Sequence, residues 1–279
     1  MAEPNSPTEP ARDRRVTTRD FIALKERGEK IAVVTAYDVL FARLVDEAGV
    51  DGVLVGDSAG QVVAGYESTL PVTLDQMIYH AQAVRRGVRR ALVLFDMPFL
   101  TYQVSAEEAM RNAGRVLRET GAQAVKIEGG TETIAETIRR LVSVGIPVMG
   151  HLGLTPQSVH AFGGYGLRGR ESDERAEIVA AAHRLEDAGC FSLVLEMLPR
   201  GLAMEISSFL HIPTVGIGAG PDCDGQVLVL PDLLGLNPGF APKFLKRFAE
   251  LGAATREAVG RYVEEVKSGT YPGPEHSYD

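Results

Sequence analysis

Short apolar runs rich in β-branched residues alternate with longer segments of helical periodicity along most of the chain. The runs are nearly continuous rather than alternating, which is the pattern of strands buried on both faces of a parallel sheet. Several of the intervening segments begin with a helix-capping residue type and stop at a glycine, as helices do. The strand candidates are residues 31–35, 52–55, 91–95, 124–127, 147–149, 192–195, 214–217 and 226–230.

Repeated strand–helix units within 279 residues predict an α/β fold of the (β/α)8 TIM-barrel type, as one domain over residues 16–279. A doubly wound open sheet stays the alternative, because periodicity alone does not prove closure. An N-terminal helix is expected after Thr17, since Thr17 and Asp20 have the spacing of a capping box. Residues 241–267 predict one or two amphipathic C-terminal helices, and the polar, proline-rich residues 1–15 predict a disordered tail.

The charge balance narrows the class of partner. Lys plus Arg number 29 against 37 Asp plus Glu, and the formal net charge of -8 argues against nucleic acid or an anionic membrane as the main partner. Cys190 and Cys223 lack metal-ligand spacing, so neither a disulfide scaffold nor a thiolate zinc site is indicated. Without an apolar leader or an apolar run of about 18 residues, we expect a soluble cytoplasmic protein whose mature form is the whole chain.

Polar or ionisable residues stand at the carboxyl ends of five consecutive strand candidates. In (β/α)8 barrels the active site is assembled at that face from several strands. One such residue is usually just an exposed strand end, whereas a series of them predicts a site. The residues are Asp57 with Ser58, Asp96, Lys126 with Glu128, His151 and Glu196.

Three of these residues form a set suited to a hard cation. Asp57, Asp96 and Glu128 offer only oxygen donors, which favours Mg²⁺ over zinc. Taken alone, each carboxylate is about as often a helix cap or a partner of Arg or Lys as it is a metal ligand. Lys126 lies two residues before Glu128, so both side chains point to the same face of a strand. There Lys126 either holds an anionic substrate or balances buried charge.

Glu196 is the candidate general base. Its apolar neighbours Leu195 and Met197 disfavour the ionised carboxylate and so strengthen it as a base, although an exposed strand end without a role is the alternative. His151 is a second-rank candidate, because a lone histidine is more often structural than catalytic. The glycine-rich segment 216–220 lacks the GxGxxG spacing of a dinucleotide site, and either binds an anion or only allows close packing.

With these residues in this order, the chain resembles the ketopantoate (3-methyl-2-oxobutanoate) hydroxymethyltransferase family, from about Thr17 to Tyr278. The resemblance rests on a chain-long ordered set rather than on one short motif. The matching segments are residues 35–38, 55–58, 68–73, 126–130, 150–158 and 271–276.

The resemblance implies a Mg²⁺-dependent (β/α)8 enzyme of pantothenate and coenzyme A biosynthesis. Such an enzyme transfers a hydroxymethyl group from 5,10-methylenetetrahydrofolate to 3-methyl-2-oxobutanoate through a metal-stabilised enolate. Its partners are the keto acid and the folate, and it forms homo-oligomers, commonly decamers. By position, the metal ligands are Asp57, Asp96 and Glu128, the last directly or through water; the keto-acid contacts are Asp57, Ser58, Asp96 and Lys126; the proton acceptor is Glu196; and Tyr37 and His151 are second-rank site residues.

Two positions depart from the family pattern. Arg168 stands where the family usually has Gln, in a segment, residues 162–170, that we interpret as a lid. Pro231 stands where a His is common. Two other functions stay open: a Mg²⁺-dependent lyase or mutase acting on another small 2-oxo acid, which shares the metal and enolate chemistry, and a non-catalytic barrel.

Overall fold

The computed structural model describes residues 14–278. The chain divides into two compact units, the first ending at Leu228 and the second beginning at Val229. The predicted tail, residues 1–15, lies almost entirely outside the described residues. The assignment of residues 16–279 to one domain stays a prediction.

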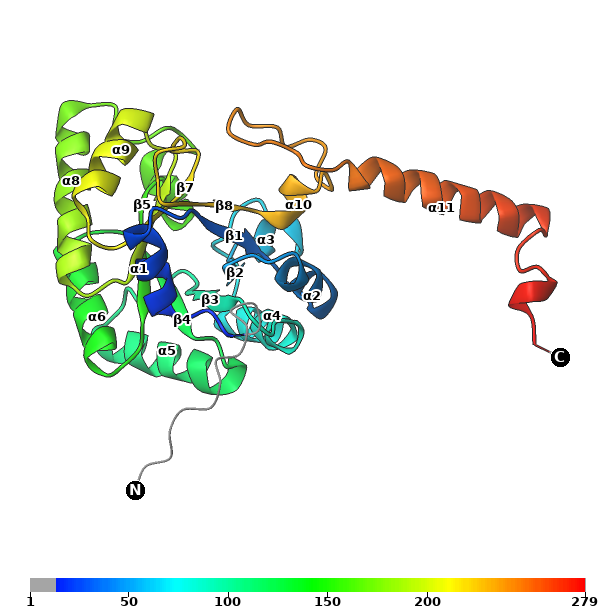
Figure 1. The fold of residues 1–279 in the computed structure, drawn as a ribbon, viewed down its shortest axis with the longest axis horizontal. Helices are drawn as coiled ribbons and strands as arrows, with labels where there is room; N and C mark the ends of the chain where they lie inside the picture. The colour runs from blue at the N-terminus through cyan, green and yellow to red at the C-terminus, as the bar shows by residue number, and fades with distance from the viewer. Residues whose placement is uncertain (1–13, 279) are drawn as a thin grey trace, which may run out of the picture. The chain divides into compact units, whose positions relative to one another are not determined.

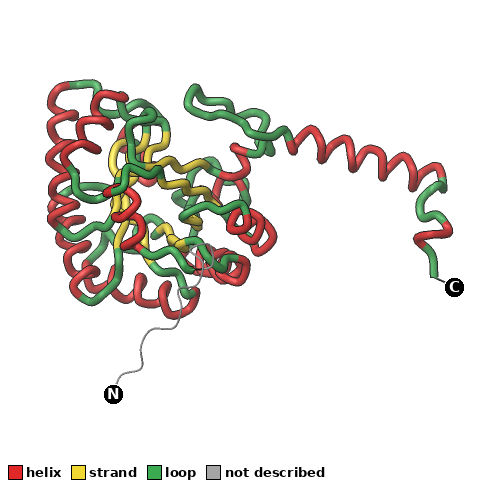
Figure 2. The backbone as a smooth tube through the Cα atoms, viewed as in Figure 1, coloured by secondary structure: helices red, strands yellow, loops and turns green. Residues whose placement is uncertain are grey.

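The first unit is a closed barrel of parallel strands in the order of the sequence (Figures 1 and 2). The last strand pairs with the first, which confirms the (β/α)8 prediction and excludes the open sheet. The strands are β1 (Ile31–Thr35), β2 (Gly52–Val55), β3 (Leu92–Asp96), β4 (Ala124–Glu128), β5 (Val148–Gly153), β6 (Ser192–Glu196), β7 (Thr214–Ile217) and β8 (Gly225–Leu228).

Closure between β1 and β8 depends on a glycine. Gly225 pairs in register with Ile31. A Cβ atom at position 225 would lie 2.5 Å from the carbonyl oxygen of Ile31, which is closer than any side chain tolerates. The missing side chain therefore lets the last strand approach the first.

Helices surround the strands of this unit, as Figure 1 shows for α4, α5, α6 and α8. Their ends follow the sequence signals: Ser105 Oγ accepts the backbone N–H of Glu108, and Gly121 ends α5 in the left-handed conformation. The predicted capping box is formed, because Asp20 Oδ2 accepts the N–H of Thr17 at 2.7 Å. The helices are α1 (Thr18–Glu26), α2 (Val39–Glu47), α3 (Ala59–Val62), α4 (Leu74–Gly87), α5 (Ala106–Thr120), α6 (Glu132–Ser143), η1 (Pro156–Ser158), α7 (Val159–Phe162), α8 (Ser172–Asp187) and α9 (Arg200–Phe209).

The core of the barrel is a cluster of apolar side chains from all eight strands and from α1. Phe21 of α1 is fully buried and packs edge-on against Phe191, with the ring centroids 6.0 Å apart. Burying such a side chain stabilises the fold by about 1.5–3 kcal/mol. The strand members of the cluster are Ile31, Val33, Leu54, Leu92, Leu94, Ala124, Met149, Val194, Val215 and Val227, with Ile217 packed against them.

The second unit contains α10 (Leu230–Leu233), α11 (Leu251–Ser268) and η2 (Pro274–His276). The helix predicted over residues 241–267 begins only at Leu251, so its predicted start is wrong. The N–H groups of Phe248 and Leu251 bond to the carbonyls of Leu233 and Leu234, which holds the preceding segment in a loop. None of the helices in the described part of the chain is long and apolar enough to cross a membrane.

Candidate active site

The inward face of the barrel changes from apolar to ionisable along four neighbouring strands. Leu92 and Leu94 of β3 belong to the core cluster, and Asp96 follows at the same step of two. Alternate residues of a strand share a face, so Asp96 points inward at the carboxyl end. The same step leads from Ala124 to Lys126 and Glu128 in β4, from Met149 to His151 in β5, and from Val194 to Glu196 in β6.

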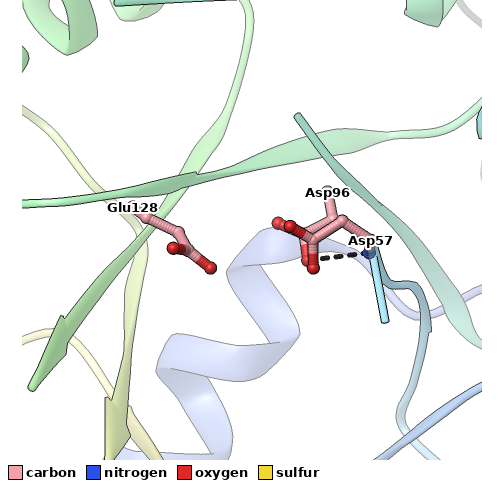
Figure 3. A group of neighbouring side chains, drawn as sticks. All are labelled: Asp57, Asp96 and Glu128. Carbon is pink, nitrogen blue, oxygen red and sulfur yellow. Dashed lines mark hydrogen bonds between the residues drawn. The ribbon is translucent and has the colours of Figure 1, made fainter. Parts of the chain in front are cut away.

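Asp57, Asp96 and Glu128 meet at this end of the barrel. Each offers an oxygen within 4.8 Å of the others, and all three residues are buried. Figure 3 shows the Glu128 carboxylate directed toward the two aspartates, and the backbone N–H of Asp57 donates to Asp96 Oδ2 at 3.2 Å. The strands β2, β3 and β4 thus supply an all-oxygen donor set of the kind that binds hard divalent cations.

Lys126 lies among these carboxylates. Its Nζ is 2.6 Å from Asp96 Oδ1 and 3.3 Å from Glu128 Oε1. Burial alone would lower the pKa of Lys126, but the attraction of Asp96, Glu128 and Asp57 outweighs it and raises the pKa above its ordinary value. Lys126 therefore stays charged, and one cation faces three buried carboxyl groups.

The pKa values of two of these carboxyl groups shift in opposite directions. Burial would raise the pKa of Glu128, but Lys126 and His151 outweigh it and lower the pKa to about 2. Burial and the neighbouring Asp96 and Glu128 raise the pKa of Asp57 well above its usual range. The raised pKa of Asp57 shows that the three carboxylates repel one another, and a bound cation would favour the ionised form of Asp57.

His151 lies between two acidic side chains. Its Nδ1 is 3.2 Å from Glu128 Oε1 and its Nε2 is 3.3 Å from Glu196 Oε2. The second approach is an ion-pair contact without hydrogen-bond geometry, since no hydrogen-bond partner among the described residues reaches Nε2. Burial and Lys126 would lower the pKa of His151, but the two glutamates outweigh them and raise it to about 9. Glu196 itself is the more exposed partner, with 18% of its side-chain surface accessible.

The backbone around Glu196 is fixed on both sides. Its carbonyl accepts the N–H of Leu154 at 2.9 Å, and the N–H of Met197 donates to Ile217 at 2.9 Å. Met197 has a φ of 49°, a left-handed conformation that costs roughly 1–2 kcal/mol for a residue with a side chain. Gly153 has a φ of +95°, and a Cβ atom there would lie 2.1 Å from the Glu196 carbonyl oxygen. The ends of β5 and β6 are therefore packed backbone to backbone.

Gln157 and Tyr102 also join the cluster, although sequence reasoning gave them no role. The Gln157 side-chain amide donates to Asp57 Oδ2 at 3.0 Å, and its backbone N–H donates to Glu128 Oε2 at 3.0 Å. The Tyr102 hydroxyl donates to Gln157 Oε1 at 2.8 Å. Gln157 follows β5 at the carboxyl end of the barrel. The expectation that polar residues after a strand gather at this face, which identified His151, could also have identified Gln157.

Ser58 follows Asp57 in the chain, and Tyr37 contacts Ser58. Ser58 is half-buried, and its Oγ is 2.9 Å from the Tyr37 hydroxyl. The ring nitrogen Nδ1 of His80 is 2.8 Å from the Tyr37 carbonyl oxygen. Of the predicted site residues, Ser58 and Tyr37 contact each other. The others, Asp57, Asp96, Lys126, Glu128, His151 and Glu196, are joined by direct contacts.

The two departures from the family pattern lie in different units. The Arg168 guanidinium stacks over the Phe162 ring at 3.8 Å from its centroid and forms an ion pair with Glu174. Both partners lie within or close to segment 162–170, whose action as a lid stays a prediction. Pro231 is in the first turn of α10 in the second unit.

Comparison with known proteins identifies close relatives over most of the sequence. The family model for ketopantoate hydroxymethyltransferase matches residues 15–274. A 3-methyl-2-oxobutanoate hydroxymethyltransferase of Prosthecochloris aestuarii is 55% identical, with 94% of this chain and 96% of the relative covered. The enzyme of the same name from Anaeromyxobacter dehalogenans is 57% identical, over 96% of this chain and 89% of the relative.

Solved structures share the fold at low sequence identity. A phosphonopyruvate hydrolase has a TM-score of 0.62 at 12% identity, with 94% of this chain and 91% of that chain covered. A 2,3-dimethylmalate lyase, a member of the PEP mutase/isocitrate lyase superfamily, has a TM-score of 0.59 at 19% identity, with coverage of 94% and 91%. These likenesses agree with the closed barrel.

Proposed function

The chain belongs to the ketopantoate hydroxymethyltransferase family, and from that premise we propose that it transfers a hydroxymethyl group to 3-methyl-2-oxobutanoate. The donor is 5,10-methylenetetrahydrofolate, the products are 2-dehydropantoate and tetrahydrofolate, and one water molecule is consumed. The reaction serves pantothenate and coenzyme A biosynthesis. The observation that carries the proposal is a buried acid cluster with Glu196 connected to it through a single imidazole ring.

The donor set suits Mg²⁺. Asp57 and Asp96 would bind the ion directly, and Glu128 would bind it directly or through water. Their buried oxygens lie close together without a thiolate, which is the chemistry of a hard cation. When bound there, Mg²⁺ would withdraw electrons from the 2-oxo group of the substrate and make its C3 proton acidic.

Lys126 and Ser58 would hold the keto acid. Lys126 is buried and charged beside Asp96 and Glu128, so its ammonium can attract the substrate carboxylate. Ser58 is half-buried next to Asp57, and the Tyr37 hydroxyl fixes its Oγ at 2.9 Å. Together they would present the C3 carbon toward Glu196.

Glu196 would remove the C3 proton. Its carboxylate is the partly exposed member of the group, so a substrate reaches it without displacing the barrel core. His151 would orient this carboxylate, because Nε2 faces Glu196 Oε2 while Nδ1 is anchored to Glu128. The resulting carbanion, delocalised as the enolate, then attacks the methylene carbon carried by the folate.

Deuterium exchange tests the proposal. The protein is incubated with 3-methyl-2-oxobutanoate and Mg²⁺ in deuterated buffer, and incorporation at C3 is followed by NMR. We expect exchange without folate, and 2-dehydropantoate after 5,10-methylenetetrahydrofolate is added. The matched control is 3,3-dimethyl-2-oxobutanoate, which has no C3 hydrogen to exchange.

The outcomes separate the candidate functions. Exchange without hydroxymethyl transfer would favour the lyase or mutase acting on another 2-oxo acid. Absence of exchange at any Mg²⁺ concentration would contradict the enolate step and favour a non-catalytic barrel. We further propose that the enzyme works in the cytoplasm as a homo-oligomer, as a decamer by resemblance to its family, and sedimentation velocity measures that state.

A further inference from the structure

Gln157 binds two carboxylates of the acid cluster, although the proposed reaction gives it no role. It is buried in η1, after β5, with 6% of its surface accessible. It lies 100 residues from Asp57 in the sequence and still donates its side-chain amide to that carboxylate. Its backbone N–H binds the second carboxylate, Glu128. One residue thus links two of the three acids.

The hydrogen bonds fix the orientation of the amide. Nε2 faces two acceptors, Asp57 Oδ2 at 3.0 Å and the Met97 carbonyl at 2.9 Å. Oε1 faces two donors, the Tyr102 hydroxyl at 2.8 Å and the Gln103 amide at 3.1 Å. A flipped amide would place an oxygen against two acceptors, so only one orientation satisfies all four contacts.

Tyr102 fixes that amide from behind. Its hydroxyl accepts the backbone N–H of Glu128 at 3.2 Å and donates to Gln157 Oε1. Tyr102 is 1% exposed, and burial together with the nearby Glu128 raises the pKa of its phenol well above the usual value. The hydroxyl therefore keeps its proton and its role as a donor.

We propose that Gln157 is a positioning residue for the cation site, an inference that rests on the proposed function. By binding Asp57 Oδ2, its amide fixes the orientation of a carboxylate that offers an oxygen within 4.8 Å of ligand atoms of Asp96 and Glu128. The affinity of the site for a divalent cation therefore depends on an amide that does not bind the cation.

The test measures Mn²⁺ binding by electron paramagnetic resonance, with the metal alone and no substrate. Gln157→Asn shortens the side chain by one methylene and withdraws the amide from Asp57. Groups that orient metal ligands typically contribute about 10–100-fold to affinity, and we expect Kd to rise by that factor. Tyr102→Phe removes only the hydroxyl, and with it the hydrogen bond that holds Gln157 Oε1; the loss of that support is expected to raise Kd by roughly 2–10-fold.

Controls separate positioning from folding. Gln82→Asn makes the same shortening in a side chain of α4 that donates to the Glu119 carbonyl at 3.1 Å, and it should leave Mn²⁺ binding unchanged. A variant that merely misfolds lowers the number of sites per chain, whereas a positioning defect raises Kd at full stoichiometry. Tyr102→Phe keeps the buried ring, so it carries the test where Gln157→Asn does not fold.

Two results would overturn the inference, and they differ in meaning. If the folded Gln157→Asn and Tyr102→Phe variants bind Mn²⁺ as tightly as the wild type, Gln157 does not position the site, while the cation site itself stands. A wild-type protein that binds no Mn²⁺ would remove the cation site itself, and the role of Gln157 with it.

Discussion

Glu196 Oε2 lies 3.3 Å from His151 Nε2, so a partly exposed carboxylate and the buried acid cluster share a single imidazole ring. The contact joins β5 to β6, whose ends are also held by the hydrogen bond from Leu154 to Glu196. The candidate base is therefore held in place from its side chain and from its backbone.

Replacing Glu196 with Gln should abolish C3 exchange while leaving Mn²⁺ binding intact. The amide keeps the shape of the side chain but accepts no proton, and a general base contributes about 10²–10⁴-fold to a rate. The measurement is deuterium incorporation into 3-methyl-2-oxobutanoate. Glu205→Gln, which removes an exposed α9 carboxylate paired with Arg175 of α8, is the control. Wild-type exchange in the Glu196 variant would exclude it as the base.

Asp57→Asn and Asp96→Asn should each weaken the dependence of exchange on Mg²⁺. Loss of a ligand should cost at least roughly tenfold in affinity, the lower end of what outer partners contribute. The Mg²⁺ concentration giving half-maximal exchange measures the effect. Asp75→Asn is the matched control, because Asp75 is exposed and pairs with Arg115 at 2.6 Å. An unchanged Mg²⁺ titration would remove the substituted residue from the ligand set.

Gly153→Ala should lower both the thermal stability and the exchange rate. A side chain at a φ of +95° costs about 1–3 kcal/mol, and its Cβ would also lie 2.1 Å from the Glu196 carbonyl oxygen, which must then move. Gly145→Ala provides the control, since Gly145 has a φ of +86° with open space around it. Differential scanning calorimetry and exchange should separate the two variants: both lose stability, and only Gly153→Ala loses activity. Equal exchange in both would show that the contact does not hold Glu196.

Cys190 should make the fold less stable at alkaline pH. Burial raises the pKa of its thiol from 9.0 to about 12. A raised pKa in the folded state means that the stability is fully present below pH 9 and is lost as the pH rises toward 12, because only the unfolded thiol ionises in that window. In this window the free energy of unfolding falls by about 1.4 kcal/mol per pH unit. Urea denaturation between pH 8 and 11 should show a steeper decline for the wild type than for Cys190→Ala. Parallel curves would contradict a buried, protonated thiol.

Much of the fold was predictable from local pattern. The strand candidate at residues 214–217 coincides with β7, and Ser105 and Gly121 bound α5 as their residue types indicate. These signals are local, because continuous apolar runs and helix caps depend on neighbours within a few residues. The end of the chain was less predictable: α11 begins at Leu251 because backbone contacts to Leu233 and Leu234 hold the preceding residues in a loop.

The sequence by itself determined which strand ends carry ionisable residues, and parallel strands in a barrel align those ends at one face. Only the tertiary structure decided how the side chains meet there. His151 turns toward both Glu128 and Glu196, and Gln157 reaches Asp57 across 100 residues of chain. Contacts of this kind have no period and no fixed spacing, because they arise when closure of the barrel brings distant strands and loops together.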